Sequence, residues 1–149
     1  MTHTFTLSKS EIIARVETEA AYIAVKTDKD YDTERIKKAD SDMTNIFFDE
    51  ACQRLEQLML HFMAENQEET EADWSVTFDK VNYPERLTNI LHGAMKVLVQ
   101  KHLLMQWLNM VGDTDGVKPV IDAEALAEKH FRHLLLERTK PFQVVTQPM

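Results

Sequence analysis

The chain has 149 residues, a formal net charge of −8 and one cysteine, and 44% of its residues are hydrophobic. This length and composition predict one ordinary globular domain and argue against intrinsic disorder. The low content of glycine (3) and proline (4) favours helices over glycine-rich nucleotide-binding folds and β-sandwiches, and the single cysteine excludes an internal disulfide or a cysteine-rich zinc site.

The first predicted helix covers residues 9–27. Ser8 and Glu11 have the spacing of a capping box, and Leu7 and Ile12 occupy the two positions of a hydrophobic staple. Apolar residues then recur at helical spacing on one side. The charged residues 28–42 that follow predict a loop or an exposed helical extension.

The second predicted helix begins near Ser41 or Asp42, either of which can cap it, and runs to about Gln67. Phe48, Leu55 and Phe62 recur every seven residues on its apolar side. An acidic stretch follows and predicts a solvated linker.

Three short segments alternate apolar and polar residues and therefore predict strands: 2–7, 74–79 and 142–146. Because a single short strand is unstable alone, these segments must pair with one another or with another chain. We expect their apolar residues to form a protein interface, although a place in the core is an equal alternative for Trp74. The predicted interface residues are Phe5, Leu7, Trp74, Val76, Phe78, Phe142 and Val144.

The third and fourth predicted helices complete the fold. The third runs from Pro84 to Gly112, and its wide apolar arc predicts a central position. Residues 113–116 predict a turn, Pro119 is expected to close the loop, and the fourth helix is expected from about Asp122 to before Pro141. The expected fold class is mainly α: one domain, 1–149, with a four-helix bundle-like core, short β segments, and extended arms at about 1–7 and 141–149.

Each candidate metal-binding or catalytic residue lacks a further residue that such a site requires. His130 and His133 share one helix side without further zinc ligands, so a solvated pair is favoured. No histidine has a glutamate three residues before it, which argues against a ferritin-like site. Cys52 lies among apolar residues and is expected to be a small core hydrophobe.

An acidic run offers a weaker alternative. Glu65, Glu68 and Glu71 resemble half of the magnesium site of all-α nucleotide pyrophosphohydrolases, but Thr88 stands where a second acidic pair would need a member. We therefore expect no catalytic residue, no cofactor, no metal and no enzymatic activity. A metal-dependent hydrolase remains the third alternative.

Charge is distributed unevenly along the chain. Residues 1–83 contain 18 acidic and 9 basic residues (−9), whereas residues 84–149 contain 7 acidic and 8 basic residues (+1). Lys37 and Lys38 form the only adjacent basic pair, which argues against sequence-specific nucleic-acid binding. The sequence predicts no secretory signal, and the segment 90–111 is too polar for a membrane span, so an intracellular protein without membrane association is expected.

The order of elements carries a family resemblance. The first matching feature is the capped helix start at 7–13. The second is a helix face of aromatic, alanine and leucine residues, namely Phe47, Phe48, Ala51 and Leu55. The third is a long helix that begins with a proline and ends near a tryptophan, with Pro84, Leu87, Ile90, Leu98 and Trp107. This layout resembles the small helical head–tail connector proteins of tailed bacteriophages, which form adaptor rings between portal and tail. The fourth helix and the extended C-terminus depart from the smaller members of that family.

The resemblance implies a structural protein of the virion, assembled in the host cytoplasm. Its partners would be further copies of the chain in a homo-oligomeric ring, together with neighbouring portal or tail proteins. The three strands would bridge neighbours, and the acidic residues of the first 83 positions would line a passive DNA channel. The alternative is a cytoplasmic helical bundle that acts as a protein-interaction or regulatory module without catalytic activity.

Overall fold

The computed structural model describes residues 2–27, 41–63, 73–80, 82–110, 112 and 114–137. Within these ranges the chain is mainly helical, with four α-helices and one two-stranded antiparallel sheet, which confirms the predicted fold class. The elements in chain order are β1 (Thr2–Ser8), α1 (Lys9–Thr27), α2 (Ser41–Met59), η2 (Leu60–Phe62), β2 (Asp73–Asp79), η3 (Glu85–Leu87), α3 (Thr88–Met110) and α4 (Thr114–Leu136).

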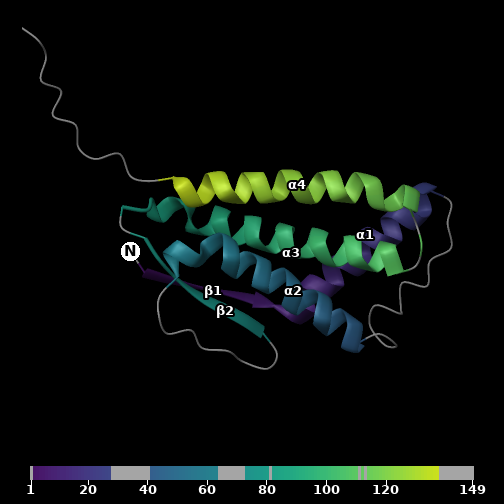
Figure 1. Cartoon of the computed structure of the whole chain (residues 1–149), viewed down its shortest axis with the longest axis horizontal. Coiled ribbons are helices and arrows are strands. Elements are labelled where there is room, and N and C mark those ends of the chain that lie inside the picture. Colours follow the sequence, from purple (N-terminus) through teal and green to yellow (C-terminus); the bar gives the residue numbers. More distant parts are fainter. Residues whose placement is uncertain are drawn as a thin grey trace, which may run out of the picture.

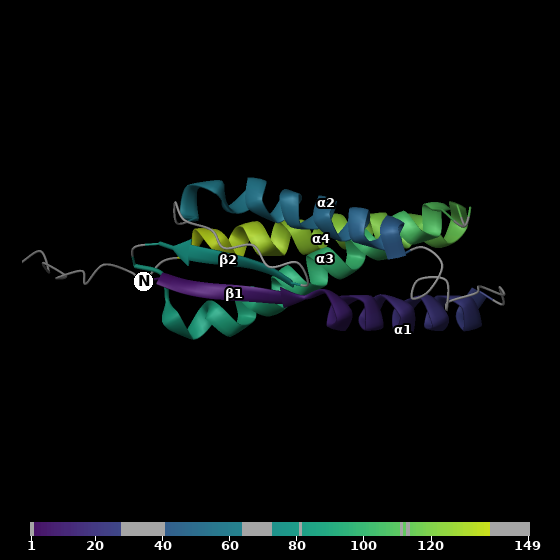
Figure 2. The same cartoon turned by 90° about the horizontal axis from the view of Figure 1, so that it is seen from below.

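Helix α3 lies at the centre of the molecule, as its wide apolar arc predicts. Helix α4 packs along it in the antiparallel direction, and the sheet lies at the side of the bundle away from α4 (Figure 1). Helices α1 and α2 lie on opposite sides of α3 (Figure 2). Nine residues of α3 are buried: Leu91, Ala94, Met95, Leu98, Val99, Leu103, Leu104, Trp107 and Leu108.

The two strands pair with each other over their full length. Thr2 lies opposite Asp79, and Ser8 lies opposite Asp73. Because side chains alternate along a strand, one side of the sheet is apolar and faces the core, while the other carries hydroxyls. On the hydroxyl side, Thr6 Oγ1 is 3.0 Å from Ser75 Oγ. The segment at 2–7 is therefore an integral strand of the domain and not the extended arm that we expected.

The start of α1 follows the sequence signal closely, with one difference. Ser8 Oγ accepts a long hydrogen bond of 3.5 Å from the Glu11 amide, and the staple residues Leu7 and Ile12 are both buried. The Glu11 carboxylate does not close the capping box. It lies 3.3 Å from Lys96 Nζ and thereby links the first turn of α1 to α3.

Two predicted helix boundaries are wrong. The sequence predicts that the second helix reaches Gln67, but α2 ends at Met59 and the single turn η2 ends at Phe62. Met63 is extended, with ψ at 139°, and forms an isolated antiparallel bridge with Phe78 of β2. Pairing with the sheet therefore ends the helical stretch, and residues 64–67 lie outside the described part of the chain.

The fourth helix begins at Thr114, not at Asp122. Residues 114–116 therefore belong to the helix and not to the expected turn, and Pro119 does not close a loop. Pro119 lies inside the helix, near its start, where its ring removes one backbone hydrogen bond. Val117 and Val120 flank it and are buried in the core, so their burial offsets that loss.

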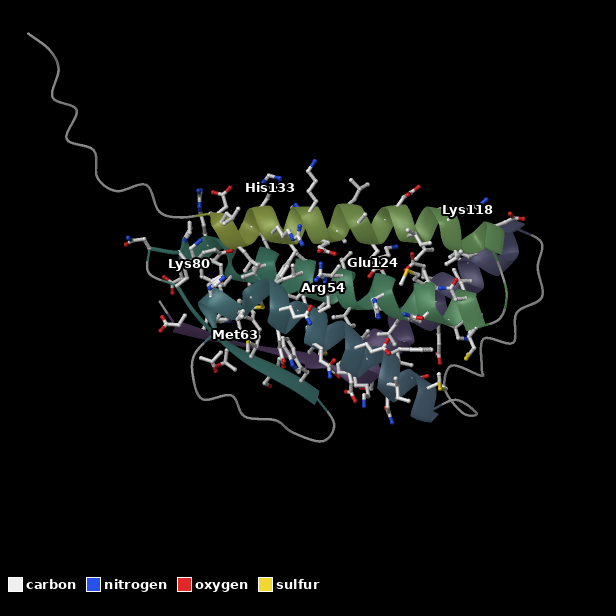
Figure 3. The ribbon with its side chains drawn as sticks, viewed as in Figure 1. Arg54, Met63, Lys80, Lys118, Glu124 and His133 are labelled. Atoms are coloured by element: carbon white, nitrogen blue, oxygen red, sulfur yellow. The ribbon has the colours of Figure 1, made fainter. Side chains whose placement is uncertain are left out.

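The end of α4 is fixed by side chains from the segment between β2 and α3. Tyr83 donates its hydroxyl to the Leu134 carbonyl at 3.0 Å. Lys80, labelled in Figure 3, donates to the carbonyls of Leu135 and Glu137, the latter at 2.9 Å. These contacts satisfy carbonyls that a helix end leaves free, and the cation suits the negative end of the helix dipole.

Candidate functional site

The predicted interface residues of the two strands lie inside the domain. Phe5, Leu7, Val76 and Phe78 are fully buried. Trp74 is also buried, and its indole N–H donates a hydrogen bond to Glu56 Oε1 at 2.9 Å. Of the two roles expected for Trp74, the structure therefore shows the place in the core. In this fold their side chains serve the chain's own core. The predicted third strand, with Phe142 and Val144, lies outside the described residues.

No described group of three or more His, Cys, Asp or Glu side chains is arranged to hold a metal ion. His130 and His133 are exposed on the outer side of α4. Cys52 is buried, and burial, together with the charges of Asp49 and Glu56, raises the pKa of its thiol. This thiol therefore stays protonated near neutral pH and is a poor nucleophile. The acidic residues at 65–71 lie outside the described part.

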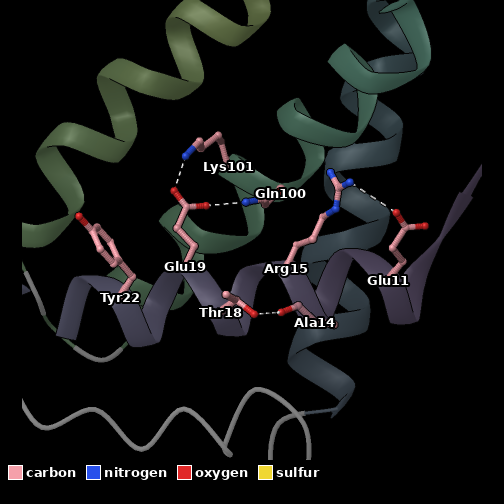
Figure 4. Close-up of a pocket in the computed structure, with 8 residues that line it drawn as sticks. All are labelled: Glu11, Ala14, Arg15, Thr18, Glu19, Tyr22, Gln100 and Lys101. Atoms are coloured by element: carbon pink, nitrogen blue, oxygen red, sulfur yellow. Dashed lines mark hydrogen bonds and ion pairs between the residues drawn. The ribbon is translucent and has the colours of Figure 1, made fainter. Parts of the chain in front are cut away.

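An open groove of about 700 Å³ runs along α1 and the middle of α3 (Figure 4). It is lined by Glu11, Ala14, Arg15, Thr18, Glu19, Tyr22, Gln100 and Lys101. Two acidic residues form its hydrogen bonds and ion pairs. Glu19 accepts from Gln100 at 2.6 Å and from Lys101, and Glu11 lies 3.6 Å from Arg15. Because these charges neutralise one another, the groove offers a shallow, nearly neutral surface.

Apolar residues extend this surface along α3. Ile90 is 51% exposed and Val97 39% exposed, and both lie on the same side of α3 as Lys101 by helical spacing. Gly93 lies beside them, and a Cβ added there would meet no atom within 4 Å. Tyr22, 67% exposed, lies at the α1 side of the groove. We call the groove, which includes Tyr22, together with the neighbouring Ile90 and Val97 the groove face.

A second apolar surface lies on α2. Ile46 is 48% exposed and Leu60, in η2, is 66% exposed; Met43 is exposed near the other end. We call Met43, Ile46 and Leu60 the α2 face. The two faces are carried by different helices: the groove face by α1 and α3, and the α2 face by α2 and η2. Helices α1 and α2 themselves lie on opposite sides of α3 (Figure 2). Helix α4 exposes a third set along another edge, namely Ile121, Leu126 and Leu136.

None of the described helices has the length and apolar character that a membrane span requires. Comparisons with protein-family models, with curated proteins and with solved structures give no match for this chain.

Proposed function

We propose that the chain is a structural subunit that assembles head-to-tail with copies of itself, the groove face of one copy receiving the α2 face of the next. The observation that carries this proposal is that different helices expose apolar residues, with one set on α1 and α3 and another on α2 and η2. Helices α1 and α2 lie on opposite sides of α3 (Figure 2). Exposed apolar residues that share one surface of a domain can mark a protein interface. A contact between two unlike surfaces is heterologous, and such contacts close into rings when the rotation between subunits permits.

The expected strength of one contact can be bracketed from the side chains that it would bury. Six partly exposed apolar side chains would contribute roughly 1–2 kcal/mol each on burial. That sum, roughly 6–12 kcal/mol, is comparable to the 4–15 kcal/mol that association costs in lost freedom. A single contact is therefore weak. Closing a ring gives every subunit two contacts and raises the stability of the assembly by avidity.

We further propose that this assembly is the head–tail connector ring of a tailed bacteriophage, in the virion, between portal and tail proteins. The resemblance in element order supports this assignment, and in this proposal the groove and α2 faces provide the contacts between subunits. In this proposal the tail at 142–146, with Phe142 and Val144, reaches a neighbouring subunit or an adjoining ring. Half of the acidic residues of the first 83 positions lie in 28–40 and 64–72, outside the described part, so their placement toward a channel stays a prediction.

A mixing experiment tests the head-to-tail arrangement. One variant carries Ile90→Asp and Val97→Asp on the groove face, and the other carries Ile46→Asp and Leu60→Asp on the α2 face. Each variant alone should be monomeric, because every contact needs both faces. An equimolar mixture should form heterodimers and nothing larger, since each variant retains one intact face.

The control is Leu126→Asp on α4, a leucine that is 68% exposed and outside both faces. This variant should assemble like the unmodified chain. Because one contact is weak, the mixture is measured at about 1 mM. Failure to form heterodimers at that concentration, while the unmodified chain self-associates, would refute the pairing of these two faces. Equal loss of assembly in the Leu126→Asp variant would point to α4 as the contact surface.

A further inference from the structure

His102 lies where three helices meet. Its Nδ1 is 3.0 Å from Glu124 Oε1 on α4, and its Nε2 is 3.7 Å from Glu50 Oε2 on α2. The ring is mostly buried, and Nε2 is shielded from solvent without a hydrogen-bond partner. One imidazole on the central helix thus faces a carboxylate from each of two other helices.

The protonation state decides whether this arrangement is favourable. A neutral ring with its proton on Nδ1 binds Glu124 but leaves the buried Nε2 lone pair facing the Glu50 carboxylate. A neutral ring with its proton on Nε2 leaves the Nδ1 lone pair facing the Glu124 carboxylate instead. Only the imidazolium presents an N–H to both carboxylates. The hydrogen bond to Glu124 raises the pKa of His102, and Glu50 acts in the same direction against the lowering effect of burial.

Charged groups near the ring come from α2 and α4. Helix α2 presents Glu50 and, one turn further, Arg54. Helix α4 presents Glu124 and, one turn further, Glu128, which binds Arg54 at 2.5 Å. Figure 3 labels Arg54 and Glu124 near the middle of the molecule, between α2 and α4. The His102 site and the Arg54–Glu128 pair are therefore two successive polar links that hold α2 beside α4.

We propose that protonated His102 is a pH-sensitive latch that holds α2 onto the α3–α4 pair, and that loss of its proton loosens α2. The folded ring binds its proton more tightly than the unfolded chain does, so the latch is complete at low pH and is lost as pH rises through the folded pKa. The proposal concerns one helix within a single chain and stands independently of the proposed self-assembly.

The chain contains a reporter for this motion. Cys52 is its only cysteine, lies on α2 and is buried, so a thiol reagent reaches it when the structure around it opens, as it does when α2 moves away. The labelling rate with N-ethylmaleimide is measured from pH 6 to pH 9 and divided by the rate of the urea-unfolded chain at the same pH. This ratio removes the intrinsic pH dependence of the thiol and gives a protection factor.

The latch predicts that protection falls with rising pH, about tenfold for each unit by which the folded pKa of His102 exceeds the unfolded one. The variant His102→Gln should show lower protection at pH 6 and no fall toward pH 9. Glu50→Gln, which keeps the size of the side chain, should reduce the fall without abolishing it. The exposed His133→Gln should behave like the unmodified chain.

Two outcomes would overturn the latch: protection that is constant across the pH range in the unmodified chain, or the same fall in His102→Gln. Repeating the labelling at a tenfold higher protein concentration separates the latch from assembly. The latch predicts the same pH-dependent fall at both concentrations, whereas protection of α2 by neighbouring copies alone would vanish on dilution.

Discussion

Arg54 of α2 and Glu128 of α4 form an ion pair between two helices that are far apart in sequence, with Arg54 Nη2 2.5 Å from Glu128 Oε1. Arg132, one turn further along α4, also lies 2.8 Å from this carboxylate. Both arginine side chains are largely open to solvent, so screening weakens the interaction.

We therefore expect Arg54→Ala to lower the free energy of unfolding by no more than about 1 kcal/mol. Urea denaturation of Arg54→Ala, Glu128→Gln and the double variant measures the coupling between the two side chains. A coupling energy well above 2 kcal/mol would contradict the picture of a screened pair and would make this link the main attachment of α2.

Two glycines form a matched pair for testing backbone conformation. Gly112 ends α3 with φ at +78°, a region that alanine enters only with strain, whereas Gly93 lies within α3 and faces open space. Gly112→Ala should destabilise the fold by about 1 kcal/mol, and Gly93→Ala should stabilise it by up to about 1 kcal/mol. Thermal unfolding of both variants checks the opposite signs, and stabilisation by Gly112→Ala would contradict the left-handed helix end.

We expect the free energy of unfolding to fall at alkaline pH because of Tyr83. Burial, assisted by the charge of Glu137, raises its pKa from 10.0 to about 12. The unfolded chain gives up this proton near pH 10 while the folded chain retains it. Stability should therefore fall between about pH 10 and pH 12, by about 1.4 kcal/mol per pH unit.

The variant Tyr83→Phe isolates this effect from other titrations. At pH 8 it should be about 1 kcal/mol less stable than the unmodified chain, because the hydrogen bond to the Leu134 carbonyl is lost. Near pH 11 the difference should vanish or reverse. A difference that stays constant between pH 8 and pH 11, measured by urea denaturation, would contradict the raised pKa.

Removal of residues 138–149 tests the role of the tail. The contacts of Lys80 with Leu135 and Glu137 and of Tyr83 with Leu134 remain in the shortened chain, so its helical circular dichroism should be unchanged. Self-association should weaken if the tail reaches a neighbour. Loss of the helical signal would instead show that the tail belongs to the core.

Local sequence signals predict most element types in this fold. Ser8 marks the start of α1 because a hydroxyl before a helix can satisfy a free amide, and Gly112 marks the end of α3 because the left-handed region suits glycine. The start of α4 is not predicted in this way. Its glycine and proline indicate a loop, but the burial of Val117 and Val120 overrides that local preference.

Long-range pairing is what the sequence does not reveal. Alternation predicts both strands, yet nothing local indicates that Phe5 lies opposite Val76. The same limit applies to His102, whose two carboxylates come from helices α2 and α4. Ile90 and Val97 have the spacing of buried residues, yet both are exposed, and the open space beside Gly93 agrees with this.

The molar mass in solution tests the central claim of self-assembly most directly. Light scattering over a hundredfold range of concentration, reaching about 1 mM, covers the weak contact expected from the six apolar side chains of the two faces. We predict a mass that rises with concentration toward a closed oligomer, and rings in negative-stain images. A mass that stays at 17.3 kDa throughout would contradict self-assembly and favour a helical module that binds a different protein.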